Sequence, residues 1–139
     1  MTVKDYMQHQ LITVSPEESV KTVYQRMQQN HIRHVPVVTG QGMLVGLVTD
    51  RDIRQARASD DPHLVEYELG YLLEKMTVQD VMTPTPVTVR GDTPISEAGR
   101  LLVEKKFGCL PVVTDNNTLQ GILTVTDILR AYVAPGAGQ

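Results

Sequence analysis

The stretch Gly46-Leu47-Val48-Thr49-Asp50-Arg51-Asp52 decides the fold, because it returns 75 residues later as Gly121-Ile122-Leu123-Thr124-Val125-Thr126-Asp127. The same offset aligns three further pairs of segments without a gap: 3–7 with 78–82, 13–14 with 88–89, and 36–39 with 111–114. A constant offset over such a span indicates an internal repeat. The 139-residue chain is therefore predicted to contain two copies of one structural unit.

Each copy has the pattern strand, helix, strand, strand, helix. In the first copy, residues 12–14 form a short β-branched strand that Ser15-Pro16 ends. Apolar residues then recur at helical spacing and predict a helix over about residues 18–30: Val20, Val23, Tyr24 and Met27. Two apolar strands, 35–39 and 44–49, are separated by a glycine turn, and a second helix starts at Asp50. This mixture of helices and hairpin strands predicts an α+β fold.

The residues between and after the copies complete the predicted organisation. We expect repeat 1 over residues 1–58, a linker with a connecting helix over 59–77, repeat 2 over 78–133 and a flexible tail over 134–139. One apolar face marks the connecting helix: Val65, Leu69, Leu72, Leu73 and Met76. Because a short connector needs less apolar surface than this, we expect a lid or a dimer element, and hence a homodimer of twofold symmetry.

Composition excludes several classes of protein. The net charge of −3 is spread along the chain without a polybasic block, which disfavours nucleic acid and anionic membranes as partners. Residues 1–14 contain no apolar segment of the secretory type, and no apolar run is long enough to span a bilayer. Cys109 is the only cysteine, so the chain has no internal disulfide. We expect a soluble protein of the reducing cytoplasm.

The motif Gly-x-x-Thr-x-x-Asp is a candidate nucleotide site. A strand ending at Thr49 runs directly into a helix, so the hydroxyl lies beside free backbone N–H groups at the positive end of the helix dipole. The two carboxylate oxygens of Asp52 can accept hydrogen bonds from ribose hydroxyls, and Thr124 and Asp127 repeat the arrangement. The alternative is a capping box that only stabilises the start of the helix. The shortness of the pattern favours the capping box, whereas its duplication favours the ligand site.

Basic residues distinguish the two copies. Three of them lie where repeat 1 could contact phosphate, before the strand that contains Pro36 and inside the first motif: Arg33, His34 and Arg51. Their equivalents in repeat 2 carry no charge of this kind: Gly108, Cys109 and Thr126. We therefore expect the repeat 1 site to favour more highly phosphorylated ligands. The alternative, that Arg33 and His34 are solvated charges at a strand entrance, stays open.

The sequence predicts neither a metal centre nor a catalytic centre. His31 and His34 have no further ligands at a recognised metal spacing. Cys109 lies in a strand without a base nearby in sequence, so we expect a core thiol and not a nucleophile. The motifs of phosphate-binding loops, serine hydrolases and metalloproteases are absent from the sequence. We predict that the protein is not an enzyme.

The two motifs, the Pro-Val-Val strand before each and the Val-x-Asp-x-Met start of each copy closely resemble repeats of the cystathionine-beta-synthase (CBS) domain family. Two such repeats form a Bateman module, and the order and spacing look most like the acetoin-utilisation regulatory proteins. The resemblance covers nearly the whole chain. It implies two β-α-β-β-α repeats packed sheet to sheet around a pseudo-twofold axis, with two clefts between them, and usually a homodimer.

The same resemblance implies a regulatory ligand. Family clefts commonly bind AMP, ADP, ATP or related adenosyl ligands, and no other cofactor is required. Matching positions would line the clefts with apolar side chains, in repeat 1 Ile12, Val35 and Pro36 and in repeat 2 Val87, Leu110 and Pro111. Two hypotheses follow: a sensor of adenosine nucleotides that signals to an unknown effector protein, or a ligand-free adaptor that acts through its surface.

Overall fold

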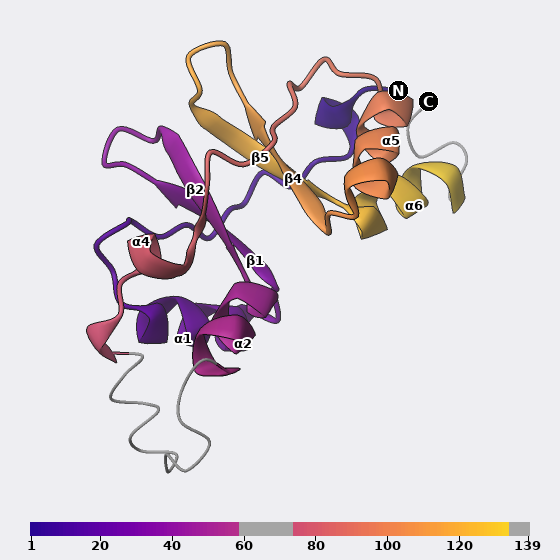
Figure 1. Ribbon diagram of the computed structural model, residues 1–139. Helices are drawn as coiled ribbons and strands as arrows, with labels where there is room; N and C mark the ends of the chain where they lie inside the picture. The colour runs from indigo at the N-terminus through magenta and orange to yellow at the C-terminus, as the bar shows by residue number, and fades with distance from the viewer. Residues whose placement is uncertain (59–73, 134–139) are drawn as a thin grey trace. The chain divides into compact units, whose positions relative to one another are not determined.

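The computed structural model describes residues 1–58 and 74–133, and these residues form two compact units. The first-repeat unit is the described part of Ile12–Thr85, and the second-repeat unit joins Met1–Leu11 to the chain from Pro86 onward. Each unit combines a small antiparallel sheet with helices (Figure 1). The predicted α+β class is confirmed, and the sheet-to-sheet packing of the repeats stays a prediction.

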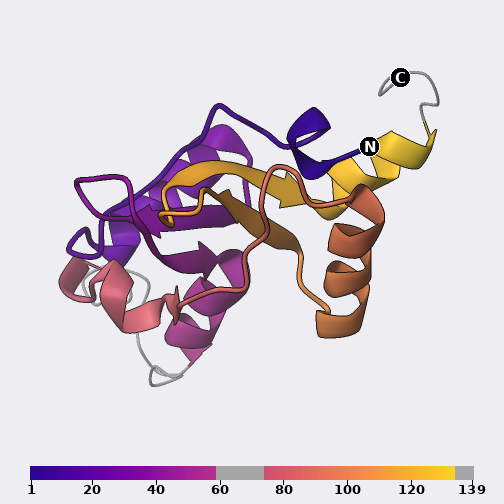
Figure 2. The same ribbon diagram turned by 90° about the horizontal axis from the view of Figure 1, so that it is seen from above.

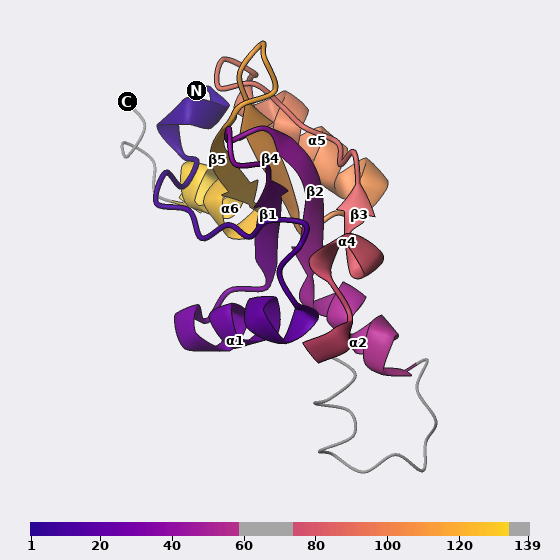
Figure 3. The same cartoon turned by 90° about the vertical axis from the view of Figure 1, so that its left-hand side faces the viewer.

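The first-repeat unit contains a sheet with the strand order β1-β2-β3, in which β3 lies beside β2 (Figure 3). Its elements are, in chain order, α1 (Val20–Asn30), β1 (His34–Val38), β2 (Leu44–Thr49), α2 (Asp50–Ala58), α4 (Val78–Val81) and β3 (Thr83–Pro84). Helix α1 begins where Ser19 Oγ accepts a hydrogen bond from the Thr22 N–H at 3.1 Å. It ends at His31, whose left-handed conformation (φ 53°) turns the chain toward β1.

The core of the first-repeat unit lies between α1 and one face of the sheet. Val20, Val23 and Met27 share one face of α1, and they are buried together with Val35 and Val37 of β1. The helical spacing read from the sequence therefore identified the buried face of α1 correctly.

The second-repeat unit repeats this design around a two-stranded sheet. Its elements are η1 (Val3–Asp5), α5 (Ile95–Lys105), β4 (Cys109–Val113), β5 (Leu119–Thr124) and α6 (Val125–Val133). Helix α5 ends at Lys106 in the left-handed conformation, with φ 58°, as α1 does at the equivalent His31. The hairpin turns match too, because Asn117 (φ 64°) and Gly42 (φ 83°) occupy equivalent positions.

The packing units do not follow the order of the chain, because each copy's first segment packs with the other copy. The Val3 N–H donates to the Thr93 carbonyl oxygen at 2.9 Å, and the Gln8 N–H to the Ile122 carbonyl oxygen at 2.9 Å. Figure 2 shows this N-terminal segment, in indigo, beside the orange and yellow elements. The second copy's first segment does the same in the first-repeat unit, where the Val78 N–H donates to the Glu18 carbonyl oxygen at 2.8 Å.

This exchange explains the glycine that opens each motif. A Cβ at Gly121 would lie 2.8 Å from the Gln8 carbonyl oxygen and 2.7 Å from the Met7 sulfur. A Cβ at Gly46 would overlap the side chain of Met82 in the same way. Only glycine lets the exchanged segment approach the second hairpin strand this closely.

Several predicted elements differ from the structure or fall outside it. The predicted strand at residues 12–14 is reduced to a single parallel bridge from Val14 to Val37, and Val89 makes the matching bridge to Val112. Most of the connecting-helix stripe lies outside the described residues, as does the tail: Val65, Leu69, Leu72, Leu73 and residues 134–139. Met76, the described member of the stripe, packs against the core of the first-repeat unit. No helix in the described ranges is long and apolar enough to cross a membrane.

Candidate functional site

The first motif forms a reciprocal hydrogen-bonded box at the start of α2. The Thr49 N–H donates to Asp52 Oδ2 at 2.9 Å, and the Asp52 N–H donates to Thr49 Oγ1 at 3.2 Å. Both residues are half-buried. The strand thus passes directly into the helix, and the hydroxyl and carboxylate are held together at the helix N-terminus.

The second motif forms the same box at the start of α6, with two added contacts. The Thr124 N–H donates to Asp127 Oδ2 at 2.9 Å and the Asp127 N–H to Thr124 Oγ1 at 3.2 Å. The Thr124 hydroxyl also lies 3.0 Å from Asp127 Oδ2, and Arg130 Nη1 lies 3.2 Å from Asp127 Oδ1. Asp127 is completely buried, so this ion pair and the box together compensate for removing its carboxylate from water.

Both motifs therefore cap the helices that follow them, as the capping-box alternative predicted. A residue that caps a helix can still bind a ligand through its remaining atoms. The box engages only Oδ2 of each aspartate. Oδ1 of Asp52 has no protein donor within the described ranges, whereas Oδ1 of Asp127 already contacts Arg130. The first-repeat unit thus leaves one carboxylate oxygen open to a ligand hydroxyl, and the second-repeat unit fills the equivalent place with Arg130.

The structure brings the predicted basic residues to the same end of the first-repeat hairpin. His34 is the strand partner of Thr49, and the Asp50 N–H donates to the Arg33 carbonyl oxygen at 3.0 Å. Arg33 and Arg51 are exposed. Burial lowers the pKa of His34 below its usual value, the Asp50 charge opposes this shift and Arg33 adds to it. Two permanent cations and a mainly neutral imidazole therefore flank the first box at neutral pH.

The second-repeat unit has the same geometry at this end without the charges. Cys109 is the strand partner of Thr124, and the Val125 N–H donates to the Gly108 carbonyl oxygen at 3.3 Å. Thr126 is exposed on α6. The two units thus present equivalent backbones with different electrostatics.

The predicted apolar wall residues divide into two groups. Val35 and Leu110 are completely buried in the core of their own units. Pro36 and Pro111 follow them in the strands and therefore lie on the opposite sheet face, where both are buried. Ile12 is half-buried and Val87 is 40% exposed, so these two side chains are the accessible members of the set.

Neither a metal centre nor a reactive thiol is found where the structure describes the chain. No group of three potential metal ligands comes together in those ranges. Cys109 is buried in β4, and burial raises the pKa of its thiol to about 12. It is a core thiol, because the thiolate that a nucleophile needs is not formed near neutral pH.

Arg130 was missed by sequence reasoning. Its spacing of three residues from Asp127 in a predicted helix was the available signal, since such pairs face each other. The equivalent of Arg130 in the first copy is Gln55, so this contact belongs to the second copy alone.

Comparison with known proteins identifies the repeats. The CBS domain family model matches residues 3–59 and 78–134. CBSX2, a chloroplastic CBS domain-containing protein of Arabidopsis thaliana, is 34% identical over 94% of the chain, which spans 63% of that protein. Its crystal structure in complex with AMP superposes with a TM-score of 0.80 at 36% identity, covering 96% of both chains.

Two further crystal structures share the fold. The CBS domain pair of protein MJ0100, in complex with 5′-methylthioadenosine and S-adenosyl-L-methionine, has a TM-score of 0.81 at 27% identity and covers 96% of this chain and 97% of its own. A putative acetoin utilization protein of Vibrio cholerae has a TM-score of 0.80 at 26% identity, with 96% and 91% covered. The resemblance read from the motifs is confirmed: the chain belongs to the CBS domain family and consists of two CBS repeats in tandem.

Proposed function

We propose that the protein is a regulatory module that senses adenosine nucleotides, AMP or ATP, and that it is not an enzyme. The observation that carries the proposal is the duplicated Thr–Asp box at a strand-to-helix junction. Each box holds a hydroxyl and a carboxylate beside a helix N-terminus. Structural relatives at 36% and 27% identity were crystallised with AMP and with two other adenosyl compounds, which supports this ligand class.

In this proposal the two boxes bind ligands differently. At the first box, Oδ1 of Asp52 accepts a ribose hydroxyl, and Arg33, His34 and Arg51 interact with phosphate. At the second box, Arg130 must share Asp127 with the ribose or turn toward the ligand. The first box therefore favours the more highly phosphorylated ligands. As the family resemblance implies, Ile12 contacts the ligand of one cleft and Val87 the ligand of the other.

We also propose a homodimer, now supported by helix α6. Four apolar side chains form a stripe along it and are 43% to 77% exposed: Val125, Leu129, Tyr132 and Val133. At the first two equivalent positions α2 carries Asp50 and Arg54, which form an ion pair at 3.7 Å. In the described ranges, all of the large hydrophobic side chains that are exposed to solvent belong to the second-repeat unit. A twofold dimer would cover such a stripe with its own copy.

The competing function is a ligand-free adaptor. Thermal unfolding and calorimetric titration with adenosine, AMP, ADP, ATP and S-adenosylmethionine separate the two. A ligand at about 100 times its Kd stabilises the folded state by roughly 2.7 kcal/mol. Saturable binding of an adenosine nucleotide, with the ligand recovered unchanged, supports the sensor. Absence of binding throughout this panel supports the adaptor, and recovery of a converted nucleotide contradicts the non-enzymatic role.

A cytoplasmic location stays a prediction.

A further inference from the structure

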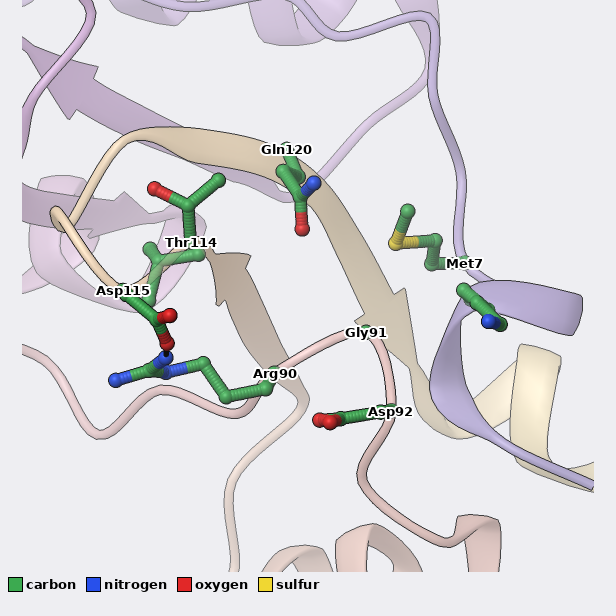
Figure 4. Close-up of a pocket in the computed structure, with 9 residues that line it drawn as sticks. Met7, Arg90, Gly91, Asp92, Thr114, Asp115 and Gln120 are labelled. Carbon is green, nitrogen blue, oxygen red and sulfur yellow. Dashed lines mark hydrogen bonds and ion pairs between the residues drawn. The ribbon is translucent and has the colours of Figure 1, made fainter.

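The second-repeat unit has a hollow of about 430 Å³ at the turn end of its hairpin. Lys4 and Met7 of the exchanged N-terminal segment line it, together with Arg90, Asp92 and Gln120. Figure 4 shows Met7, Arg90, Asp92 and Gln120 around the hollow. Gln120 and Thr124 are four residues apart on β5, so the hollow lies roughly 13 Å along the strand from the Thr–Asp box. It is therefore separate from the proposed nucleotide site.

The charges around the hollow are balanced but only partly paired. Arg90 and Asp115, which both line the hollow, form an ion pair with each other (Figure 4). Lys4 and Asp92 both line the hollow, yet neither has an ion-pair partner among the residues that the structure describes. The other carboxylate next to Lys4 is Asp5, which accepts hydrogen bonds from the Thr2 N–H at 2.9 Å and the Thr2 hydroxyl at 3.2 Å. One cation and one anion in the lining of the hollow are thus left without an ion-pair partner in the described ranges.

Neutral polar groups and the apolar side chains of Met7 and Val113 complete the lining. The Thr114 hydroxyl oxygen accepts hydrogen bonds from the Asn116 and Thr118 N–H groups at 3.3 and 3.2 Å, so its own hydrogen is free to be donated. The Gln120 amide supplies a donor and an acceptor. Met7 provides an adaptable apolar surface.

These residues belong to the second-repeat unit alone. The equivalents of Lys4, Arg90, Asp92, Asp115 and Gln120 are Gln79, Ser15, Glu17, Gly40 and Val45. Of these five positions, only that of Asp92 keeps its charge in the first repeat, as Glu17. The charged lining of the hollow is therefore not a general property of the repeat.

We propose that this hollow binds a free α-amino acid in its zwitterionic form. The carboxylate of the ligand pairs with Lys4, its ammonium group pairs with Asp92, and its side chain lies toward Met7 and Gln120. A zwitterion matches two unpaired opposite charges in a site of balanced charge, whereas a phosphate ester would bring excess negative charge next to Asp92 and Asp115. The chain would then respond to an amino acid at one site and to a nucleotide at another.

The test is an NMR titration of the full chain with the common L-amino acids, each up to about 10 mM because small open sites bind weakly. We expect at least one amino acid to shift the backbone amide signals of Gly91, Asp92 and Gln120 saturably. The N-acetyl and methyl ester derivatives of that amino acid each lack one charge and should bind roughly tenfold more weakly. No saturable shift with any amino acid, or equal binding of these derivatives, would overturn the proposal.

Variants sharpen this test without touching the core. Asp92→Asn and Lys4→Gln alter exposed residues and should each weaken binding by roughly three- to tenfold. Glu17→Gln changes the equivalent acidic position of the first repeat and should have no effect. Gly91→Val adds a side chain to the lining of the hollow, where a Cβ would lie 3.5 Å from the Lys4 Cβ and 3.7 Å from Gln120 Oε1, and should abolish binding. Unchanged binding in both Asp92→Asn and Gly91→Val would contradict the site.

Discussion

The two repeats share a backbone but carry different surfaces. The first repeat has Arg33, His34 and Arg51 next to its Thr–Asp box. The second repeat has uncharged residues at these positions, and Arg130 forms an ion pair with the aspartate of its box, Asp127. The exposed side of α6 is apolar at positions where α2 is charged. Duplication preserved the hydrogen bonds that start each helix and freed the surrounding residues to diverge. We therefore expect the first repeat to bind the phosphate groups of the ligand and the second repeat to form the dimer interface.

The largest expected difference between the repeats concerns stability. Asp127→Ala removes a buried cap and leaves the Thr124 N–H without its acceptor, so the free energy of unfolding should fall by about 2–3 kcal/mol. Asp52→Ala removes a half-buried cap and should cost about 1 kcal/mol. Urea unfolding of both variants checks this. A cost for Asp52→Ala equal to that for Asp127→Ala would show that burial and Arg130 do not distinguish the two caps.

The next difference concerns association through α6. Leu129→Lys places a charge in the proposed interface on both subunits. Because Leu129 is 56% exposed, burying the rest of its side chain is worth about 1 kcal/mol in each subunit, and losing both should weaken the dimer roughly 30-fold. The matched control is Arg54→Lys at the equivalent position of α2, which should leave the dimer unchanged. Sedimentation velocity across a range of protein concentrations measures both. A wild-type chain that stays monomeric at micromolar concentration would contradict the proposed dimer. A Leu129→Lys variant that dimerises as strongly as the wild type would contradict the proposal that α6 forms the interface.

Some of these features were predictable from the sequence, for physical reasons that differ between residues. The spacing of Val20, Val23 and Met27 reports a buried helix face directly, and the repeat offset revealed equivalent positions. The Thr–Asp boxes were also predictable, because their hydrogen bonds connect residues three apart.

Long-range features were not predictable in this way. Hydrogen bonds such as Gln8 to Ile122 join segments far apart in sequence, so no local pattern reported the exchanged segments. The exposure of Leu129 and the burial of Asp127 depend on tertiary packing, which hydrophobicity along one helix does not determine. The hollow next to Lys4 arises from the exchange itself, and sequence reasoning missed it for that reason.

A smaller difference concerns phosphate recognition. Arg33→Ala and Arg51→Ala should each weaken AMP and ATP binding by roughly three- to tenfold at low salt and leave adenosine nearly unchanged, because charge-assisted contacts are lost. Thr126→Ala, at the position equivalent to Arg51, is the control and should behave as wild type. Calorimetric titrations at two salt concentrations measure the effect. An unaltered preference for phosphate in both arginine variants would make these residues solvated surface charges.

The smallest expected effect concerns pH. The pKa of His34 is lowered in the folded state, so the unfolded state takes up its proton more readily. Well above pH 6.5, the usual pKa of histidine, His34 is neutral in both states and its titration does not change the free energy of unfolding. As the pH drops below 6.5 toward the lower folded pKa, the unfolded state is protonated first, so the free energy of unfolding falls. Urea unfolding between pH 7.5 and 5.5, with His34→Gln as the comparison, should show a smaller decline for the variant. Equal declines would exclude His34 as the cause.

Nucleotide binding at the Thr–Asp boxes is the central claim, and calorimetric titration of AMP into Asp52→Asn, Asp127→Asn and the double variant tests it most directly. Asparagine keeps an oxygen for the helix cap while removing the charge, so binding is measured on a folded chain. The account predicts that each single variant weakens binding at its own box by about 5- to 150-fold and that the double variant binds AMP at neither. AMP binding of wild-type strength in a folded double variant would contradict it and leave these aspartates as helix caps alone.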